Sequence, residues 1–189
     1  MPDNNNHTEI IHNSTDAQNN TEIKYPSGDL LLSIVQKEYD YETTRKTVLE
    51  TRTGVLITLA AAILTFTFSN IKLPKIKTPI NEFSSLIFYV SYFLIGATAV
   101  ITIGISLCYL LRVLFIAKYN RLDTTDINRQ AAGSVPDVVA TALMEQYEKI
   151  LRHNQNVNND KMILYHKGTN WLIISLFTSV ILYGIALNL

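Results

Sequence analysis

Serine and threonine hydroxyls are the polar groups that recur at regular intervals in the apolar parts of this chain. Their spacings of three, four and seven residues place them on one face of a helix. Such a face can hydrogen-bond to a neighbouring helix, or it can line a polar pore when several copies assemble. The candidate pore-lining residues are Ser91, Thr98, Thr102 and Ser106 in one stretch and Thr58, Thr65 and Ser69 in another.

Other kinds of chemistry are not indicated by the sequence. It has no G-x-S-x-G, H-E-x-x-H or P-loop motif, and its four histidines lack the spacing of a metal site. The single cysteine, Cys108, lies in an apolar stretch, where we expect it to act as a small packing residue. We therefore expect neither an enzyme nor a bound cofactor. With a net charge of zero and scattered basic residues, we also expect no nucleic-acid binding.

The hydroxyls are positioned by three stretches without charged side chains, 53–71, 83–111 and 168–189. As helices these would be about 28, 44 and 33 Å long, against a hydrocarbon core of roughly 30 Å. They also lack histidine, and intramembrane ionisable groups normally mark ion-coupled transport pathways, which we therefore do not expect. The sequence predicts an all-α membrane protein with three transmembrane helices, spanning about 53–71, 84–111 and 169–189.

The orientation follows from the basic residues near the span ends. Four of them precede the first span and seven lie between the second and third, whereas the loop between the first two spans has three. Positive residues favour the cytoplasmic side, and the N-terminus has no signal-peptide pattern. We expect a multi-span membrane protein with a cytoplasmic N-terminus and an external C-terminus.

The remaining residues predict a tail and a cytosolic helical extension. Residues 1–28, rich in Asn, Asp, Thr and Ser, are expected to be disordered. Residues 29–52 and 118–168 are expected to extend the first and third spans as a coiled-coil-like stalk, within one three-span domain covering 29–189. The alternating steps of three and four that are typical of a coiled coil appear in Leu143, Tyr147, Ile150, Asn154, Val157, Lys161 and Leu164.

A second repeat of seven residues predicts how the first helix packs on the third. It comprises Ile34, Tyr41, Val48, Val55 and Ala62. Matching the membrane entry points of two parallel helices pairs Ile34 with Ile150, Tyr41 with Val157 and Val48 with Leu164. The same register places Arg45 beside Lys161, a like-charge layer that requires Glu42 or Asp160 nearby, or else a partner in another subunit.

The arrangement of these segments resembles a known group of proteins. QKEYDYETTRKTVLETR before GVLITLAAAILTF, and EQYEKILRHNQNVNNDKMILYHKGTN before the last span, resemble small bacterial membrane effectors of nucleotide-linked antiphage systems. These are SLATT proteins and the transmembrane effector of Pycsar systems. The resemblance covers residues 30–189 and includes Arg52 and Lys161, each ahead of a span.

The resemblance implies a homo-oligomeric effector in a bacterial inner membrane that permeabilises or depolarises this membrane on a cytosolic signal. Its partners would be the lipid bilayer and a protein that produces or senses a nucleotide signal. The alternative is a non-conducting scaffold or assembly factor that docks a cytosolic partner through its helical extension.

Overall fold

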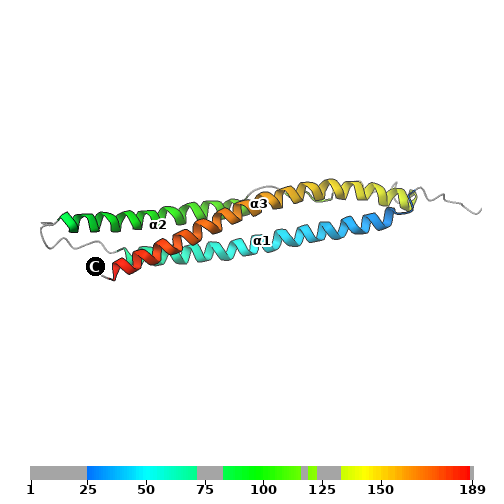
Figure 1. Ribbon diagram of the computed structural model, residues 1–189. Helices are drawn as coiled ribbons and strands as arrows, with labels where there is room; N and C mark the ends of the chain where they lie inside the picture. Colours follow the sequence, from blue (N-terminus) through cyan, green and yellow to red (C-terminus); the bar gives the residue numbers. More distant parts are fainter. Residues whose placement is uncertain (1–24, 72–82, 116–118, 123–132, 188–189) are drawn as a thin grey trace, which may run out of the picture.

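The computed structural model describes residues 25–71, 83–115, 119–122 and 133–187 of the chain. This part is built from three α-helices, α1 (Gly28–Asn70), α2 (Phe83–Phe115) and α3 (Pro136–Ala186) (Figure 1). The predicted tail lies almost wholly outside the described residues, as does the loop between α1 and α2.

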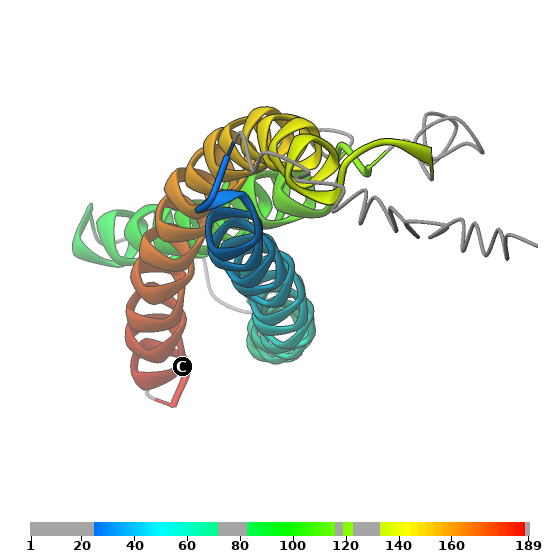
Figure 2. The same cartoon turned by 90° about the vertical axis from the view of Figure 1, so that its right-hand side faces the viewer.

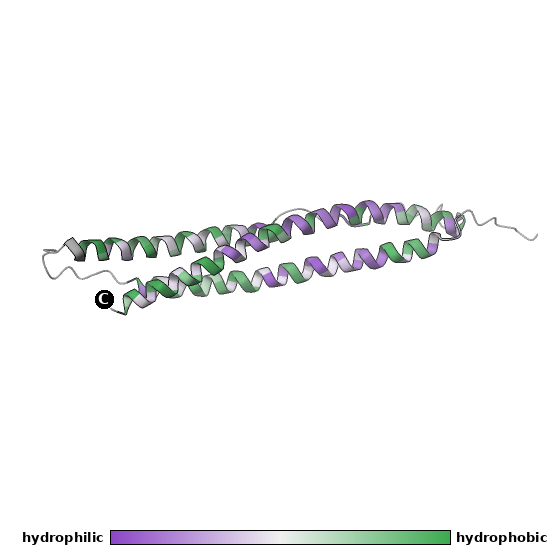
Figure 3. Cartoon of the chain, viewed as in Figure 1, coloured by the Kyte–Doolittle hydropathy of each residue, from purple (hydrophilic) through white to green (hydrophobic). Residues whose placement is uncertain are grey.

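All three helices are long and apolar enough to cross a membrane. Figure 3 shows that α2 is apolar along its length, whereas α1 and α3 each have one apolar half and one polar half. The polar halves of α1 and α3 lie beside each other and form the stalk. The predicted all-α fold, with extended first and third helices, is therefore confirmed.

Helix α3 packs in parallel with α1 and antiparallel to α2. Thr67 on α1 is hydrogen-bonded to Ser179 on α3, and Glu42, further back on α1, contacts Asn158, further back on α3. In the other direction, Ser106 on α2 donates to the Gly168 carbonyl of α3. At the end that carries the C-terminus, α3 lies between the other two helices (Figure 2).

Two apolar clusters hold the membrane halves together. One combines Ala60 and Ile63 of α1 with Ile103 of α2 and Leu172 of α3. The other joins Tyr92 of α2 to Leu182 and Ala186 of α3. All three helices thus contribute to the core.

Helix α3 continues without a break through Gly168, although glycine is a poor helix former. The glycine has a packing role instead. A Cβ atom at this position would lie 2.8 Å from Cδ2 and 2.9 Å from Cγ of Leu110. Its missing side chain therefore allows α2 to approach α3 closely.

The predicted face of α1 was wrong, although the predicted parallel direction was correct. Ile34, Tyr41 and Val48 were expected to face α3, but they are 48%, 64% and 42% exposed. The buried residues of α1 lie on the opposite side, because α1 packs on α3 through Gly28, Glu42, Leu49, Thr53, Ala60, Ile63 and Thr67.

Candidate functional site

In the part of the membrane halves that the structure describes, six serine and threonine side chains are buried inside the subunit. Three of them join helices: the Thr67 and Ser179 hydroxyls are 2.8 Å apart, and the Ser106 hydroxyl donates to the Gly168 carbonyl across 2.8 Å. Hydrogen bonds of this kind stabilise helix pairs in apolar surroundings. The six are Thr53, Thr67, Thr102, Ser106, Ser175 and Ser179.

The structure divides the candidate lining residues of α2 into two pairs. Thr102 and Ser106 are buried within the subunit, and Thr102 donates to the carbonyl oxygens of its own helix. Ser91 and Thr98 are exposed. The four residues therefore do not present one continuous surface to a second copy.

The candidate lining residues of α1 share one environment. Thr58, Thr65 and Ser69 are all exposed, and each donates its hydroxyl to the carbonyl four residues earlier in its own helix. These bonds satisfy the hydroxyl protons and leave the oxygen lone pairs facing outwards. Ala62, on the same side of α1, is also exposed. Within the membrane half, this strip of α1 therefore carries only short side chains, most of them with a hydroxyl group.

The stalk encloses a polar cluster around Glu42, which is only 4% exposed. Asn158 of α3 donates from Nδ2 to the Glu42 carboxylate at 2.6 Å and to its carbonyl oxygen at 3.0 Å. Arg45 forms an ion pair with the same carboxylate at 3.3 Å and donates to Asn159. Three hydrogen bonds thus tie α1 to α3, and the ion pair of Arg45 with Glu42 lies within α1.

The segment after α2 joins this cluster. The Tyr119 hydroxyl donates to the Glu42 carbonyl, and burial, followed by the negative charge of Glu42, raises the pKa of Tyr119 to about 12. Tyr119 is therefore a neutral hydrogen-bond donor at physiological pH. Next to it, Asn120 and Asn154 exchange two hydrogen bonds of 3.1 Å, from the Asn120 backbone N–H and from Asn154 Nδ2.

A second buried charge lies nearer the membrane, at Lys161 of α3. Its Nζ lies 2.6 Å from Oε1 of Glu50 on α1. The expected like-charge layer of Arg45 and Lys161 is therefore resolved by two separate partners, Glu42 for Arg45 and Glu50 for Lys161. The sequence anticipated Glu42, but it did not point to Glu50 or Asn158.

The predicted stalk seam of α3 faces inwards for most of its length. Asn154, Val157 and Lys161 are buried. The other members, Leu143, Tyr147, Ile150 and Leu164, are half-buried, and the ring of Tyr147 packs edge-on against Tyr39 of α1 at 5.5 Å. Within one subunit, this seam therefore serves contacts with α1 and with the segment after α2.

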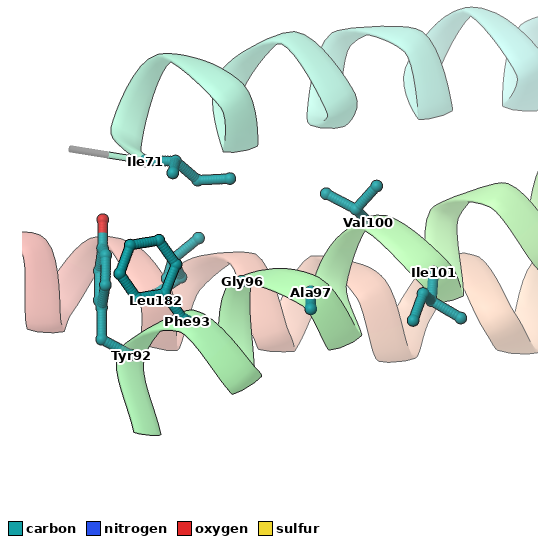
Figure 4. A pocket seen from close by; sticks show the side chains of 8 residues that line it. All are labelled: Ile71, Tyr92, Phe93, Gly96, Ala97, Val100, Ile101 and Leu182. Carbon is teal, nitrogen blue, oxygen red and sulfur yellow. The ribbon is translucent and has the colours of Figure 1, made fainter. Parts of the chain in front are cut away.

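A groove of about 360 Å³ opens at the far end of the membrane half, between the end of α1, α2 and α3. Gly96 and Ala97 leave space there between larger apolar side chains such as Ile71 and Phe93 (Figure 4). The Tyr92 hydroxyl donates to the Asn70 carbonyl at 2.9 Å beside it. Since its lining is apolar, the groove suits an acyl chain or an apolar side chain better than a polar substrate.

The exposed hydroxyl face of α1 is therefore the candidate site in the membrane half, and the buried polar contacts of the stalk are a second candidate. No family model, curated protein or solved structure matches this chain.

Proposed function

We propose that this protein is an oligomeric effector of a bacterial inner membrane, which permeabilises or depolarises the membrane when its cytosolic stalk receives a signal. The observation that carries the proposal is the exposed hydroxyl face of α1, formed by Thr58, Thr65 and Ser69. A lipid-facing position gains most from a large apolar side chain, as at the exposed Leu59 and Phe66 of the same helix. Small hydroxyl residues are better suited to a neighbouring helix or to water.

The path for ions would lie between subunits. The membrane half of one subunit is filled by packed apolar side chains, including Ala60, Ile103 and Leu172. Several copies that turn their α1 helices towards a common axis would bring the hydroxyls together along that axis. A lining of this kind conducts when it is hydrated and closes when it loses water.

The stalk is suited to transmit a signal, because α1 and α3 run from the stalk into the membrane as single helices. A partner that shifts one helix against the other would change the contacts of Glu42 with Asn158 and of Lys161 with Glu50. In this proposal the partner is a protein that produces or senses a nucleotide signal in antiphage defence.

The basic residues support a cytoplasmic stalk. Arg52 of α1, Arg112 of α2 and Lys167 of α3 are exposed, and each ends the charge-free part of its helix. Because α2 is antiparallel to the other two helices, all three charges lie at the stalk end of the membrane half. This distribution is the one that the positive-inside rule associates with the cytoplasm.

The test is uptake of a potential-sensitive dye by cells that express variants of the protein. Thr58→Val with Thr65→Val removes two hydroxyls and conserves side-chain shape, so the expected result is loss of depolarisation at unchanged expression and oligomer size. The comparison is Thr98→Val with Thr102→Val on α2. Loss of depolarisation in the α2 double variant alone would assign the pore lining to α2 and overturn the assignment to α1.

A non-conducting scaffold is the second candidate function, and one observation favours it. Leu30, Leu31 and Ile34, near the tip of the stalk, are 63%, 45% and 48% exposed, which is unusual for apolar side chains in water. A cytosolic protein could dock there. Normal membrane potential in cells that express the unaltered protein together with its signalling partner would favour the scaffold and reject the pore.

A further inference from the structure

Helix α1 has a second face that shows the spacing of a coiled coil. We call it the outer seam; its positions alternate in steps of three and four residues. All of its members are exposed in the subunit, over a length of about 42 Å at helical rise. The outer seam consists of Tyr41, Thr44, Val48, Thr51, Val55, Thr58, Ala62, Thr65 and Ser69.

Most of the outer seam lies away from the rest of its own subunit, and its stalk residues Tyr41, Thr44 and Val48 border a groove shared with α3. The residues that pack on α3, such as Leu49, Ala60 and Thr67, lie roughly 150° around the helix axis from it, at 3.6 residues per turn. The two faces of α1 therefore serve different contacts. The inner face builds the subunit, and the outer seam remains available to a partner.

We propose that the outer seam binds α1 of a second copy of this chain, in parallel and in register. The seam runs from the water-exposed stalk into the membrane half, since Tyr41 lies well before Arg52 and Thr65 well after it. Lipid cannot cover its stalk part, and a soluble protein cannot reach its membrane part. The occupant must be a helix that enters the membrane in the same direction, which α1 of a second copy supplies by symmetry about an axis normal to the membrane.

Side-chain size along the outer seam fits this occupant. In the stalk and at the membrane entry the seam carries β-branched Val48 and Val55, which favour two-stranded packing at such positions. Within the membrane it narrows to Ala62, Thr65 and Ser69, and small residues are what close helix pairs use there. The exposed residues beside the membrane part include the large side chains Leu59, Phe66 and Phe68.

The charges that flank the outer seam are complementary between two copies. In a parallel coiled coil, the residue directly before a seam position of the series Tyr41, Val48 and Val55 faces the partner helix. Its counterpart there lies five places further along the sequence. This rule pairs Asp40 of one copy with Arg45 of the other, twice per dimer. Asp40 is exposed, and Arg45 is partly exposed, with a guanidinium that has five N–H donors for its contacts.

A groove beside the outer seam gives the partner helix room. It has a volume of about 270 Å³ and lies between α1 and α3, lined by Tyr41, Val48 and Arg52 together with Met162 and Tyr165. A side chain of the second copy can enter this space as a knob enters a hole.

This contact is the one through which copies of the proposed effector would assemble. It rests on the proposed function only because both require more than one copy of the chain. Two α1 helices would pack the seam hydroxyls against each other. More copies around the same axis would turn these positions towards a central path.

The test is disulfide cross-linking of single-cysteine variants of the full chain in native membranes. Cys108→Ser removes the only native cysteine, which is exposed on α2. Val48→Cys, Val55→Cys, Thr58→Cys and Thr65→Cys then probe the outer seam, because a disulfide forms only when two Cβ atoms lie about 4 Å apart. The matched controls are Thr43→Cys and Ile57→Cys, which lie on α1 away from the seam and from the positions that flank it.

The expected result is a disulfide-linked dimer on brief oxidation at the four seam positions, at least fivefold more than at the two controls. Equal cross-linking at seam and control positions, no dimer at any position, or a product that contains another protein would each overturn the proposal. Seam-specific dimers in cells with normal membrane potential would reject the proposed function and leave this contact standing. Depolarisation without seam-specific dimers would reject this contact and leave the proposed function standing.

Discussion

Lys161 and Glu50 form an ion pair that joins the two long helices, with the Lys161 Nζ 2.6 Å from the Glu50 Oε1. The two groups differ in burial, because the side chain of Lys161 is 2% exposed and that of Glu50 is 33% exposed. The ammonium depends on the carboxylate, whereas the carboxylate also has access to water. Removing one partner should therefore have a different effect from removing the other.

We expect Glu50→Gln to destabilise the protein by about 3 kcal/mol, because it leaves a buried ammonium without its counter-charge. Lys161→Met removes the buried charge itself and should cost about 1 kcal/mol or less. Thermal unfolding in detergent measures both changes. Glu148→Gln is the control, since it breaks the exposed pair with Arg152 and should change stability by less than about 1 kcal/mol. Equal losses at Glu50 and Lys161 would contradict this account of the pair.

Val157 lies at the centre of the inward-facing stalk seam and is 7% exposed. Val157→Asp buries a carboxylate among apolar and amide groups, so we expect a loss of about 3 kcal/mol or more in unfolding free energy. Val138→Asp, on the same helix and 40% exposed, is the matched control and should be tolerated. A Val157→Asp protein with unchanged thermal stability would show that α1 and α3 do not pack through this seam.

The sequence predicted the three spans, since uninterrupted apolar stretches have few other uses, and it predicted the inward face of α3 from its coiled-coil spacing. It failed at α1 because two repeats compete there. The repeat of Tyr41 and Val48 is apolar throughout, whereas the packed repeat of Leu49, Leu56 and Ile63 begins with Glu42. Hydropathy counts Glu42 as a surface residue. Its burial is possible because the fold places the amide of Asn158 beside its carboxylate and because Arg45 of the same helix forms an ion pair with it.

The C-terminus is expected to lie on the side of the membrane opposite to the stalk. We expect an enzymatic reporter fused after Leu189 to be active only outside the cytoplasm, because the exposed basic residues Arg52, Arg112 and Lys167 lie at the stalk end. A second reporter that is active only in the cytoplasm, at the same fusion point, is the control. Activity of that second reporter would invert the topology and place the stalk outside.

Gly168 determines how closely α2 approaches α3 at the stalk end of the membrane half. A Cβ at this position would lie 2.8 Å and 2.9 Å from two carbons of Leu110 and 3.4 Å from its backbone nitrogen, so either the leucine or the helix must shift. We expect Gly168→Ala to destabilise the protein by about 1–3 kcal/mol through overpacking, and to weaken the hydrogen bond from Ser106 to the Gly168 carbonyl.

Gly104 provides the matched control, because a Cβ there would meet nothing within 4 Å. Gly104→Ala should leave stability unchanged or raise it by up to about 1 kcal/mol, since alanine is the better helix former. Combining Gly168→Ala with Leu110→Ala removes the clashing atoms, so the double variant should lose less than the sum of the single losses. The cycle compares thermal unfolding of the unaltered protein, Gly168→Ala, Leu110→Ala and the double variant. Strictly additive losses of stability would mean that Gly168 and Leu110 are not in contact.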